Sequence, residues 1–291
     1  MIAEENNIIL DHDFNALKVD ISDRILTITL NRPEKLNTFD EGMKEDFRWI
    51  ERRIEANDEI RVIIVNAEGE KAFGAGADLS WFEQDFLTER FRIEYRWIHD
   101  FFDRLERIEI PVICAAQGIC ACGGLELAMS CDFRICTEDA RFGFTEGNIN
   151  LIPGSGGCSR LIRLIGPGWA KELVLAGEFI DAVKAAELGL VTRVVPRDKL
   201  KSEARKLASK LAAKAPMALG LAKAIMNTCE NIDMASGRIL ERLGQSVNVV
   251  GGKKRAAGVL RQPRQIRRAE ELWLDREPLS GQVTMLPVHE G

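Results

Sequence analysis

The chain has 291 residues, of which 46% are hydrophobic, so it can bury a full-sized core without disulfides or metal ions. Its formal net charge of −5 argues against a general nucleic-acid-binding protein, which needs a basic face to displace counterions. No stretch reaches the roughly 20 apolar residues that a membrane-spanning helix needs, so we expect a soluble, cytoplasmic protein without a membrane partner.

The first part of the chain alternates between strand and helix patterns. Residues 16–21 and 24–30 alternate between polar and apolar side chains and predict a β-hairpin. Further strands are predicted over 61–66, 111–116 and 132–136, and helices over 40–56, 89–106 and 125–130. Strand, helix and strand at this spacing predict right-handed crossover units and a largely parallel sheet.

After residue 197 the character of the chain changes. Three helical patterns follow, over 198–214, 216–229 and 232–248, with no further strand. Residues 261–291 contain three prolines around one short amphipathic helix, predicted over 264–276. We therefore predict an α/β core over 1–197, a helical region over 198–262 and an extension over 263–291.

The seven cysteines are an odd number, and five of them lie in apolar stretches. Buried free thiols in a reducing compartment fit this distribution better than a disulfide framework does. Cys120 and Cys122 lack a second pair of metal ligands, and the three histidines are scattered along the chain. We therefore predict no metal site.

Three segments contain glycines that folding alone does not demand: 73–79 (FGAGADL), 118–126 (GICACGGLE) and 142–157 (FGFTE leading to IPGSGG). Glycine lets the main chain turn tightly and bring its N–H groups close to a ligand. Two such turns at the ends of neighbouring parallel strands can direct two N–H groups at one oxygen and form an oxyanion hole. Each segment taken singly is more simply explained as a turn. A dinucleotide-binding loop is excluded at the first, because Leu79 stands where the third glycine belongs.

Two glutamates accompany these segments. Glu126 lies in a short apolar helix, where a charge is costly without a partner or a function, and Glu146 follows Phe142 and Phe144. Apolar surroundings raise the pKa of a carboxyl group, and two close carboxyl groups separate their pKa values further. One protonated and one ionised acid suit acid–base chemistry near neutral pH, although either glutamate alone is equally explained as a salt-bridged or surface residue.

Together with Asn31-Arg32-Pro33, the segments FGAGADL, CGGLELAMSCD (122–132), FGFTE and IPGSGG resemble the enoyl-CoA hydratase/isomerase (crotonase) superfamily, most nearly its two-glutamate hydratases. The match runs in order from residue 15 to about 250. The resemblance implies an α/β crotonase (ClpP-like) fold of repeated ββα units. It also implies that the helical C-terminal region assembles a homotrimer or a homohexamer.

The resemblance further implies site residues. The backbone N–H groups of Ala77 and Gly123 would hold a thioester oxygen, and Glu126 and Glu146 would be the catalytic acid–base pair. The CoA part of an acyl-CoA would be bound by Lys35-Leu36-Asn37, Ala75, Ala77, Asp78 and Leu79. CoA is part of the substrate, so no separate cofactor is implied.

The function implied is hydration of a 2-enoyl-CoA to a 3-hydroxyacyl-CoA, or the reverse dehydration, in fatty or aromatic acid degradation. Glu126 would be the base that binds water, and Glu146 would donate the proton to the α-carbon. A double-bond isomerase, or a C–C lyase or hydrolase of the same superfamily, remains an alternative. So does an inactive protein whose basic stripe (Arg261, Arg264, Arg267, Arg268) contacts RNA or a partner.

The sequence departs from the family pattern in three places. Thr145 stands where many hydratases have proline, Cys122 where a third glycine is common, and Ala257 where glutamate is usual. The aromatic residues Trp81, Phe82 and Phe86 follow the first glycine segment, where they can line a pocket for a bulky acyl group or simply pack in the core.

Overall fold

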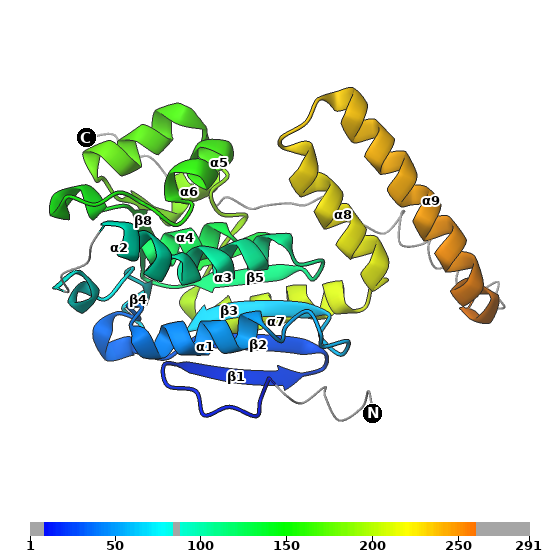
Figure 1. Ribbon diagram of the computed structural model, residues 1–291, viewed down its shortest axis with the longest axis horizontal. Helices are drawn as coiled ribbons and strands as arrows, with labels where there is room; N and C mark the ends of the chain where they lie inside the picture. Colours follow the sequence, from blue (N-terminus) through cyan, green and yellow to red (C-terminus); the bar gives the residue numbers. More distant parts are fainter. Residues whose placement is uncertain (1–8, 84–87, 260–291) are drawn as a thin grey trace. The chain divides into compact units, whose positions relative to one another are not determined.

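The computed structural model describes residues 9–83 and 88–259 (Figure 1). The chain divides into two compact units, residues 1–231 and 232–291. The first unit contains a six-stranded sheet in the order β1-β2-β3-β5-β7-β10. Its strands are β1 (Leu17–Ser22), β2 (Ile25–Leu30), β3 (Val62–Ala67), β5 (Val112–Ala116), β7 (Phe133–Thr137) and β10 (Arg193–Val195). Only the β1–β2 hairpin is antiparallel, which confirms the predicted hairpin and the largely parallel sheet.

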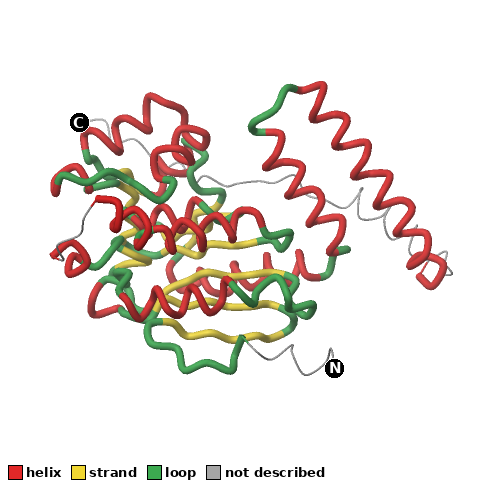
Figure 2. The backbone as a smooth tube through the Cα atoms, viewed as in Figure 1, coloured by secondary structure: helices red, strands yellow, loops and turns green. Residues whose placement is uncertain are grey.

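The central strands of this sheet are buried on both faces, because their side chains alternate between two apolar layers, whereas every second residue of the edge strand β1 is exposed. Val62 and Ile64 of β3 pack with the apolar residues of helix α7 (Leu200–Ala212). Ile63 and Val65 pack instead with side chains of the helices α1 (Glu41–Glu51) and α3 (Arg96–Arg107). Figure 2 shows helices on either side of these strands. The double burial explains why β3 is apolar along most of its length.

A second sheet has the order β4-β6-β8-β9, with strands β4 (Ala72–Gly74), β6 (Ile119–Ala121), β8 (Arg141–Gly143) and β9 (Ile180–Asp181). The first three strands are parallel to one another. Each of them follows a strand of the large sheet, and β6 leads into helix α4 (Gly123–Met129), which gives the repeated ββα pattern of the predicted fold. The parallel alignment places the ends of all three glycine segments side by side.

The remaining helices of this unit are α2 (Thr88–Glu94), α5 (Gly157–Lys171), α6 (Ala182–Glu187) and α8 (Pro216–Cys229). Short single turns are η2 (Pro33–Lys35), η3 (Leu79–Glu83), η4 (Glu146–Ile149), η5 (Glu172–Ala176) and η6 (Arg197–Lys199). The single helix predicted over 89–106 is in fact two, α2 and α3, with Tyr95 between them.

The first unit extends to residue 231, whereas the sequence analysis placed the change of character at 197. Helix α7 belongs to it because Leu200, Ala204 and Leu207 pack on the sheet. Helix α8 is anchored by buried Lys223, whose Nζ donates to the carbonyl of Leu105 at 2.9 Å and contacts Asp132 at 2.8 Å.

In the second unit the structure describes helix α9 (Met234–Val259), which begins two residues after the start of the helix predicted over 232–248 and extends past its end. The predicted helix at 264–276, the basic stripe and the extension over 263–291 lie outside the described residues. A role of the C-terminal helices in oligomer assembly stays a prediction.

Of the five cysteines in apolar stretches that were expected to be buried thiols, four are buried and Cys122 is only partly buried. Among residues 9–83 and 88–259, no helix combines the length and the apolar character needed to cross a bilayer.

Candidate active site

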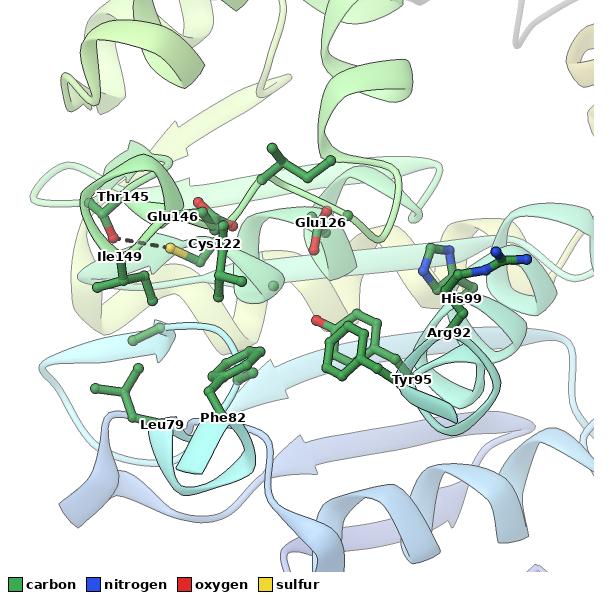
Figure 3. Close-up of a pocket in the computed structure, with 17 residues that line it drawn as sticks. Leu79, Phe82, Arg92, Tyr95, His99, Cys122, Glu126, Thr145, Glu146 and Ile149 are labelled. Atoms are coloured by element: carbon green, nitrogen blue, oxygen red, sulfur yellow. Dashed lines mark hydrogen bonds between the residues drawn. The ribbon is translucent and has the colours of Figure 1, made fainter. Parts of the chain in front are cut away.

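The three glycine segments border one cavity of about 360 Å³ (Figure 3). The first contributes Ala75, Ala77 and Leu79, the second Cys122, Gly123 and Glu126, and the third Thr145 and Glu146. Residues of α2, the α2–α3 junction and α3 complete the wall. Both predicted acids and both predicted oxyanion residues therefore meet at a single cavity.

In the first glycine segment (73–79, here called the first loop), the N–H of Ala77 points away from the adjacent segment around Phe39. Phe39 and Ala77 form an isolated parallel bridge, in which Phe39 N–H donates to Gly76 O at 2.8 Å and Asp78 N–H donates to Phe39 O at 2.9 Å. Because successive backbone groups point to opposite sides of an extended chain, the N–H of Ala77 faces the other way. It is left available to a ligand in the cavity.

The second glycine segment (118–126, here called the second loop) contains Gly123, the first residue of α4. The N–H of Gly123 has no partner within the helix. The two loops touch, since a Cβ added to Gly76 would lie 3.1 Å from the nitrogen of Gly123. A Cβ on Gly124 would lie 2.2 Å from the carbonyl oxygen of Gly74. The close approach of the two chains therefore requires glycine at both positions, and it brings the two N–H groups to one place.

Cys122 has an unusual backbone conformation for a residue with a side chain, with φ 52° and ψ −130°. Such a conformation costs on the order of 1–3 kcal/mol outside glycine. It turns the chain directly into Gly123 at the start of α4. The departure from glycine at this position is therefore accommodated with backbone strain, and the sulfur lies 3.2 Å from Oγ1 of Thr145.

Glu126 is buried, with 2% of its surface exposed. Its Oε1 accepts hydrogen bonds from the backbone N–H of Ser155 at 2.6 Å and of Gly157 at 2.9 Å. Burial raises the pKa of Glu126 to about 7, against the lowering effect of these two N–H donors, and nearby Glu146 raises it further. With one oxygen fixed, a proton on this carboxyl group sits on Oε2, and the group can exchange that proton near neutral pH.

Glu146 begins the single turn η4 and shares the cavity with Glu126 (Figure 3). Burial raises the pKa of Glu146, although hydrogen bonding, including that with Cys122, partly opposes the rise. Its Oε2 is buried and has no hydrogen-bond partner among the described residues. A buried carboxyl oxygen without a protein partner is suited to contact a bound molecule.

Arg160 of α5, which no sequence motif indicated, supports the loop that holds Glu126. Its guanidinium group is mostly buried, donates from Nη1 to the carbonyl of Ser155 at 2.9 Å, and pairs with Asp103 at 2.7 Å and Glu106 at 2.6 Å. The same Ser155 donates its N–H to Glu126. Arg160 also lowers the pKa of Glu126 by its positive charge. It thus positions the carboxyl group of Glu126 without bordering the cavity that contains both acids.

The segments predicted to bind CoA are joined to the first loop but contribute unequally to the cavity. Ala75 N–H donates to Leu36 O at 3.1 Å, so these segments are neighbours, while Lys35 is exposed at the end of η2. Lys35, Leu36 and Asp78 do not line the cavity, whereas Ala75, Ala77 and Leu79 do. Asp78 pairs with Arg32 at 3.2 Å.

Asn37 is fully buried and uses its side chain for the fold. Its Oδ1 accepts from the Arg32 N–H at 2.8 Å, and its Nδ2 donates to the carbonyls of Glu68 and Ala72 at 3.0 and 2.9 Å. These bonds join the segment after β2 to the segments around β4. The position of Asn37 in the predicted CoA segment thus has a structural explanation.

The aromatic residues after the first loop were expected either to line an acyl pocket or to pack in the core, and the two that the structure describes differ in this respect. Phe82 lines the cavity, as expected for an acyl pocket. Trp81 is buried in the core, with its ring centroid 6.1 Å from that of Trp97. Phe86 lies outside the described residues.

Three cavity residues on the α2–α3 segment had no role in the sequence analysis: Arg92, Tyr95 and His99. Tyr95 is the only tyrosine in the chain, and this single occurrence is the one feature of the sequence that could have indicated a role for it. The position of Tyr95 between two helices could not be predicted, because the apolar spacing over 89–106 is that of one continuous helix.

Comparison with known proteins agrees with this geometry. Residues 20–243 match the family described as enoyl-CoA hydratase/isomerase. The chain is 36% identical over 242 residues to a short-chain-enoyl-CoA hydratase of Clostridium acetobutylicum, covering 82% of this chain and 87% of the relative. It is 33% identical over 219 residues to a crotonyl-CoA hydratase of Syntrophomonas wolfei, covering 75% and 84%. A crystal structure of an enoyl-CoA hydratase from Bacillus anthracis superposes with a TM-score of 0.77 at 34% identity, covering 91% of this chain and 98% of that one.

Proposed function

Because the chain belongs to the enoyl-CoA hydratase/isomerase family, we propose that it adds water to the C2–C3 double bond of a 2-enoyl-CoA and, in reverse, dehydrates a 3-hydroxyacyl-CoA. The observation that carries the proposal is the meeting at one cavity of a buried and a partly buried carboxyl group with two backbone N–H groups that have no backbone partner among the described residues. Acyl-CoA is the substrate, and the chemistry requires no separate cofactor.

The thioester oxygen accepts hydrogen bonds from the N–H groups of Ala77 and Gly123. Both groups border the cavity, and neither has a backbone partner among the described residues. As water adds, negative charge develops on this oxygen, and fixed N–H donors stabilise it more than they stabilise the substrate. Each such donor contributes on the order of 3 kcal/mol to the lowering of the barrier.

Glu126 and Glu146 hold the water and move its protons. Ionised Glu126 takes one proton from the water as the water oxygen forms a bond to C3. The π electrons of the double bond move to give an enolate, and protonated Glu146 delivers a proton to C2. Proton exchange between the two carboxyl groups then restores the starting state. The two N–H donors to Glu126 favour its ionised form, and the unpartnered Oε2 of Glu146 favours a protonated one.

The same cavity favours water addition over double-bond isomerisation. An isomerase needs one carboxyl group to move a proton between two carbons, whereas binding and activating water uses two. Both Glu126 and Glu146 have raised pKa values and contact one cavity. The second acid would have no function in a one-carboxylate shuttle.

The direct test mixes purified protein with 2-enoyl-CoA esters of increasing chain length and follows loss of the conjugated thioester absorbance. We expect turnover with at least the shortest member, because the cavity of about 360 Å³ accommodates a small acyl group. A parallel assay with 3-enoyl-CoA esters detects isomerisation as a gain of the same absorbance. No turnover on any 2-enoyl-CoA, or efficient turnover only on 3-enoyl-CoA, would refute the proposal.

We further propose a homotrimer or homohexamer in the cytoplasm. Exposed apolar side chains on α8 (Met217, Met226) and, separately, on α9 (Met234, Ile239, Leu243) support association with other copies of the chain. Light scattering on the purified protein measures the mass directly, and a monomer at micromolar concentration would contradict the assembly.

A further inference from the structure

Tyr95 is held at the break between α2 and α3 by several contacts. Its backbone N–H donates to Phe91 O at 2.8 Å, and its ring stacks on that of Phe91 with centroids 5.1 Å apart. The edge of His99 meets the ring at 6.1 Å. These contacts fix the ring plane, so the direction of the hydroxyl group is determined by the fold.

The hydroxyl of Tyr95 points into the cavity and faces the carboxyl group of Glu126 (Figure 3). Burial raises the pKa of Tyr95 to about 12, and the negative charges of Glu126 and Glu146 raise it as well. The hydroxyl group therefore stays protonated at neutral pH and is a neutral hydrogen-bond donor. The side chain of Ser155 lies nearby and lowers the pKa of Tyr95, which partly opposes the effect of burial. The hydroxyl group of Ser155 itself has no hydrogen-bond partner of normal geometry among the described residues.

We propose that the Tyr95 hydroxyl is a third group in the reaction, donating a hydrogen bond to the oxygen that adds to, or leaves from, C3 of the acyl chain. This inference rests on the proposed hydration. It assigns to Tyr95 a hydrogen-bond donor to the reacting oxygen, which the two glutamates, as acceptors from the water, do not supply.

The hydrogen-bonding capacity of water supports this assignment. A water molecule has two protons to donate and two lone pairs with which to accept. Glu126 and Glu146 accept hydrogen bonds from its two O–H groups, and one lone pair forms the bond to C3. The second lone pair needs a donor, and Tyr95 presents one opposite Glu126. In the dehydration direction, the same hydrogen bond stabilises the departing oxygen.

The test compares two ligands that differ only in the oxygen at C3. Isothermal titration measures the binding of 3-hydroxybutyryl-CoA and of butyryl-CoA to the wild type and to Tyr95→Phe, which removes only the hydroxyl group. We expect the substitution to weaken binding of the hydroxy ligand by about 2- to 10-fold, the effect of one lost hydrogen bond, and to leave butyryl-CoA nearly unchanged. With crotonyl-CoA, kcat should fall by about 10-fold while KM changes little.

Equal weakening of both ligands, or none, would overturn the role of Tyr95, since a tyrosine that only packs or bonds to Ser155 cannot distinguish them. A wild type that turns over no 2-enoyl-CoA would instead overturn the proposed hydration. The two failures are therefore separable. A melting temperature for Tyr95→Phe close to that of the wild type excludes a folding defect.

A second measurement uses the fact that Tyr95 is the only tyrosine. Protein labelled with 3-fluorotyrosine gives a ¹⁹F signal from this position alone. We expect that signal to move more on addition of 3-hydroxybutyryl-CoA than on addition of butyryl-CoA. Identical shifts with both ligands would argue against a contact with the C3 oxygen.

Discussion

The backbone of Ser155 joins Glu126 to Arg160: its N–H donates to Oε1 of Glu126 at 2.6 Å, and its carbonyl accepts from Nη1 of Arg160 at 2.9 Å. Gly156 makes this possible, because a Cβ at that position would lie 1.9 Å from Nη1 of Arg160. A buried arginine thereby fixes one oxygen of the carboxyl group and leaves the other facing the cavity. The same contacts therefore fix the position of the Glu126 carboxyl group and influence its pKa.

Replacing either glutamate by glutamine keeps its shape and removes its proton transfer. We expect kcat on a 2-enoyl-CoA to fall by roughly 100- to 10,000-fold in Glu126→Gln and in Glu146→Gln. The exposed Glu138→Gln is the control and should retain activity. Full activity in both active-site variants would contradict the paired-acid mechanism.

Arg160→Met should shift the pH profile of kcat/KM. Activity rises with pH as Glu126 ionises, and Arg160 lowers the pKa of Glu126, so its removal moves the rising limb to higher pH. The loss should therefore be larger at about pH 6 than at about pH 8. Arg160→Lys should restore part of the activity.

The matched control for Arg160 is Arg163→Met, one turn further along α5. Arg163 is exposed and bonds to the Ser159 carbonyl and to Asn231 instead of to the Glu126 loop. Its profile should match that of the wild type. A loss in Arg160→Met that is the same at every pH would show that the arginine affects only folding or binding.

Glu126→Gln should be more stable than the wild type at alkaline pH. The folded pKa of Glu126, about 7, is above its ordinary value of 4.5, so the folded state binds the proton more tightly than the unfolded state. Stability of the wild type therefore falls as pH rises between these two values, and the loss persists above them. Urea unfolding should show the variant gaining on the order of 1–3 kcal/mol relative to the wild type between about pH 5 and pH 8. A constant difference across this range would refute the assigned shift.

Cys122→Gly should stabilise the protein by about 1 kcal/mol, because glycine adopts φ 52° and ψ −130° without strain. The comparison variant Cys122→Ala loses the same sulfur contact with Thr145 but keeps a Cβ. It should show no gain. Chemical denaturation of both variants decides the matter, and a lower midpoint for Cys122→Gly than for Cys122→Ala would count against strain at this residue.

Gly76→Ala should impair the oxyanion hole. A Cβ there would lie 2.7 Å from Cβ of Cys122 and 3.1 Å from the nitrogen of Gly123, so the two loops must separate. We expect kcat to fall by about 100-fold, as when an oxyanion donor is lost. Gly168→Ala, whose Cβ would meet nothing within 4 Å, is the control.

Gly123→Pro removes the proposed N–H directly, and we expect a fall in kcat of about 100-fold or more. It also places a Cβ 3.0 Å from Cε2 of Phe39, so its circular dichroism must first show a folded protein. Unchanged kcat in a folded Gly123→Pro variant would refute the assignment of this donor.

The sequence by itself determined the hairpin, the parallel strands, the three glycine segments and the two glutamates, because each leaves a local pattern. Alternation of side chains predicts β1 and β2, and glycine is required wherever backbones approach as closely as Gly124 and Gly74 do. Five short motifs in order were enough to indicate the family.

Only the tertiary structure decided which residues support and complete the site. Arg160 of α5 supports Glu126 through Ser155, and Tyr95 faces Glu126 from the α2–α3 break. Trp81 and Phe82, adjacent in sequence, separate into core and cavity. Likewise, α7 and α8 join the first unit because their side chains pack on the sheet and on the loops beside it. Such contacts depend on how crossover units stack, and residues distant in sequence carry no local pattern that records them.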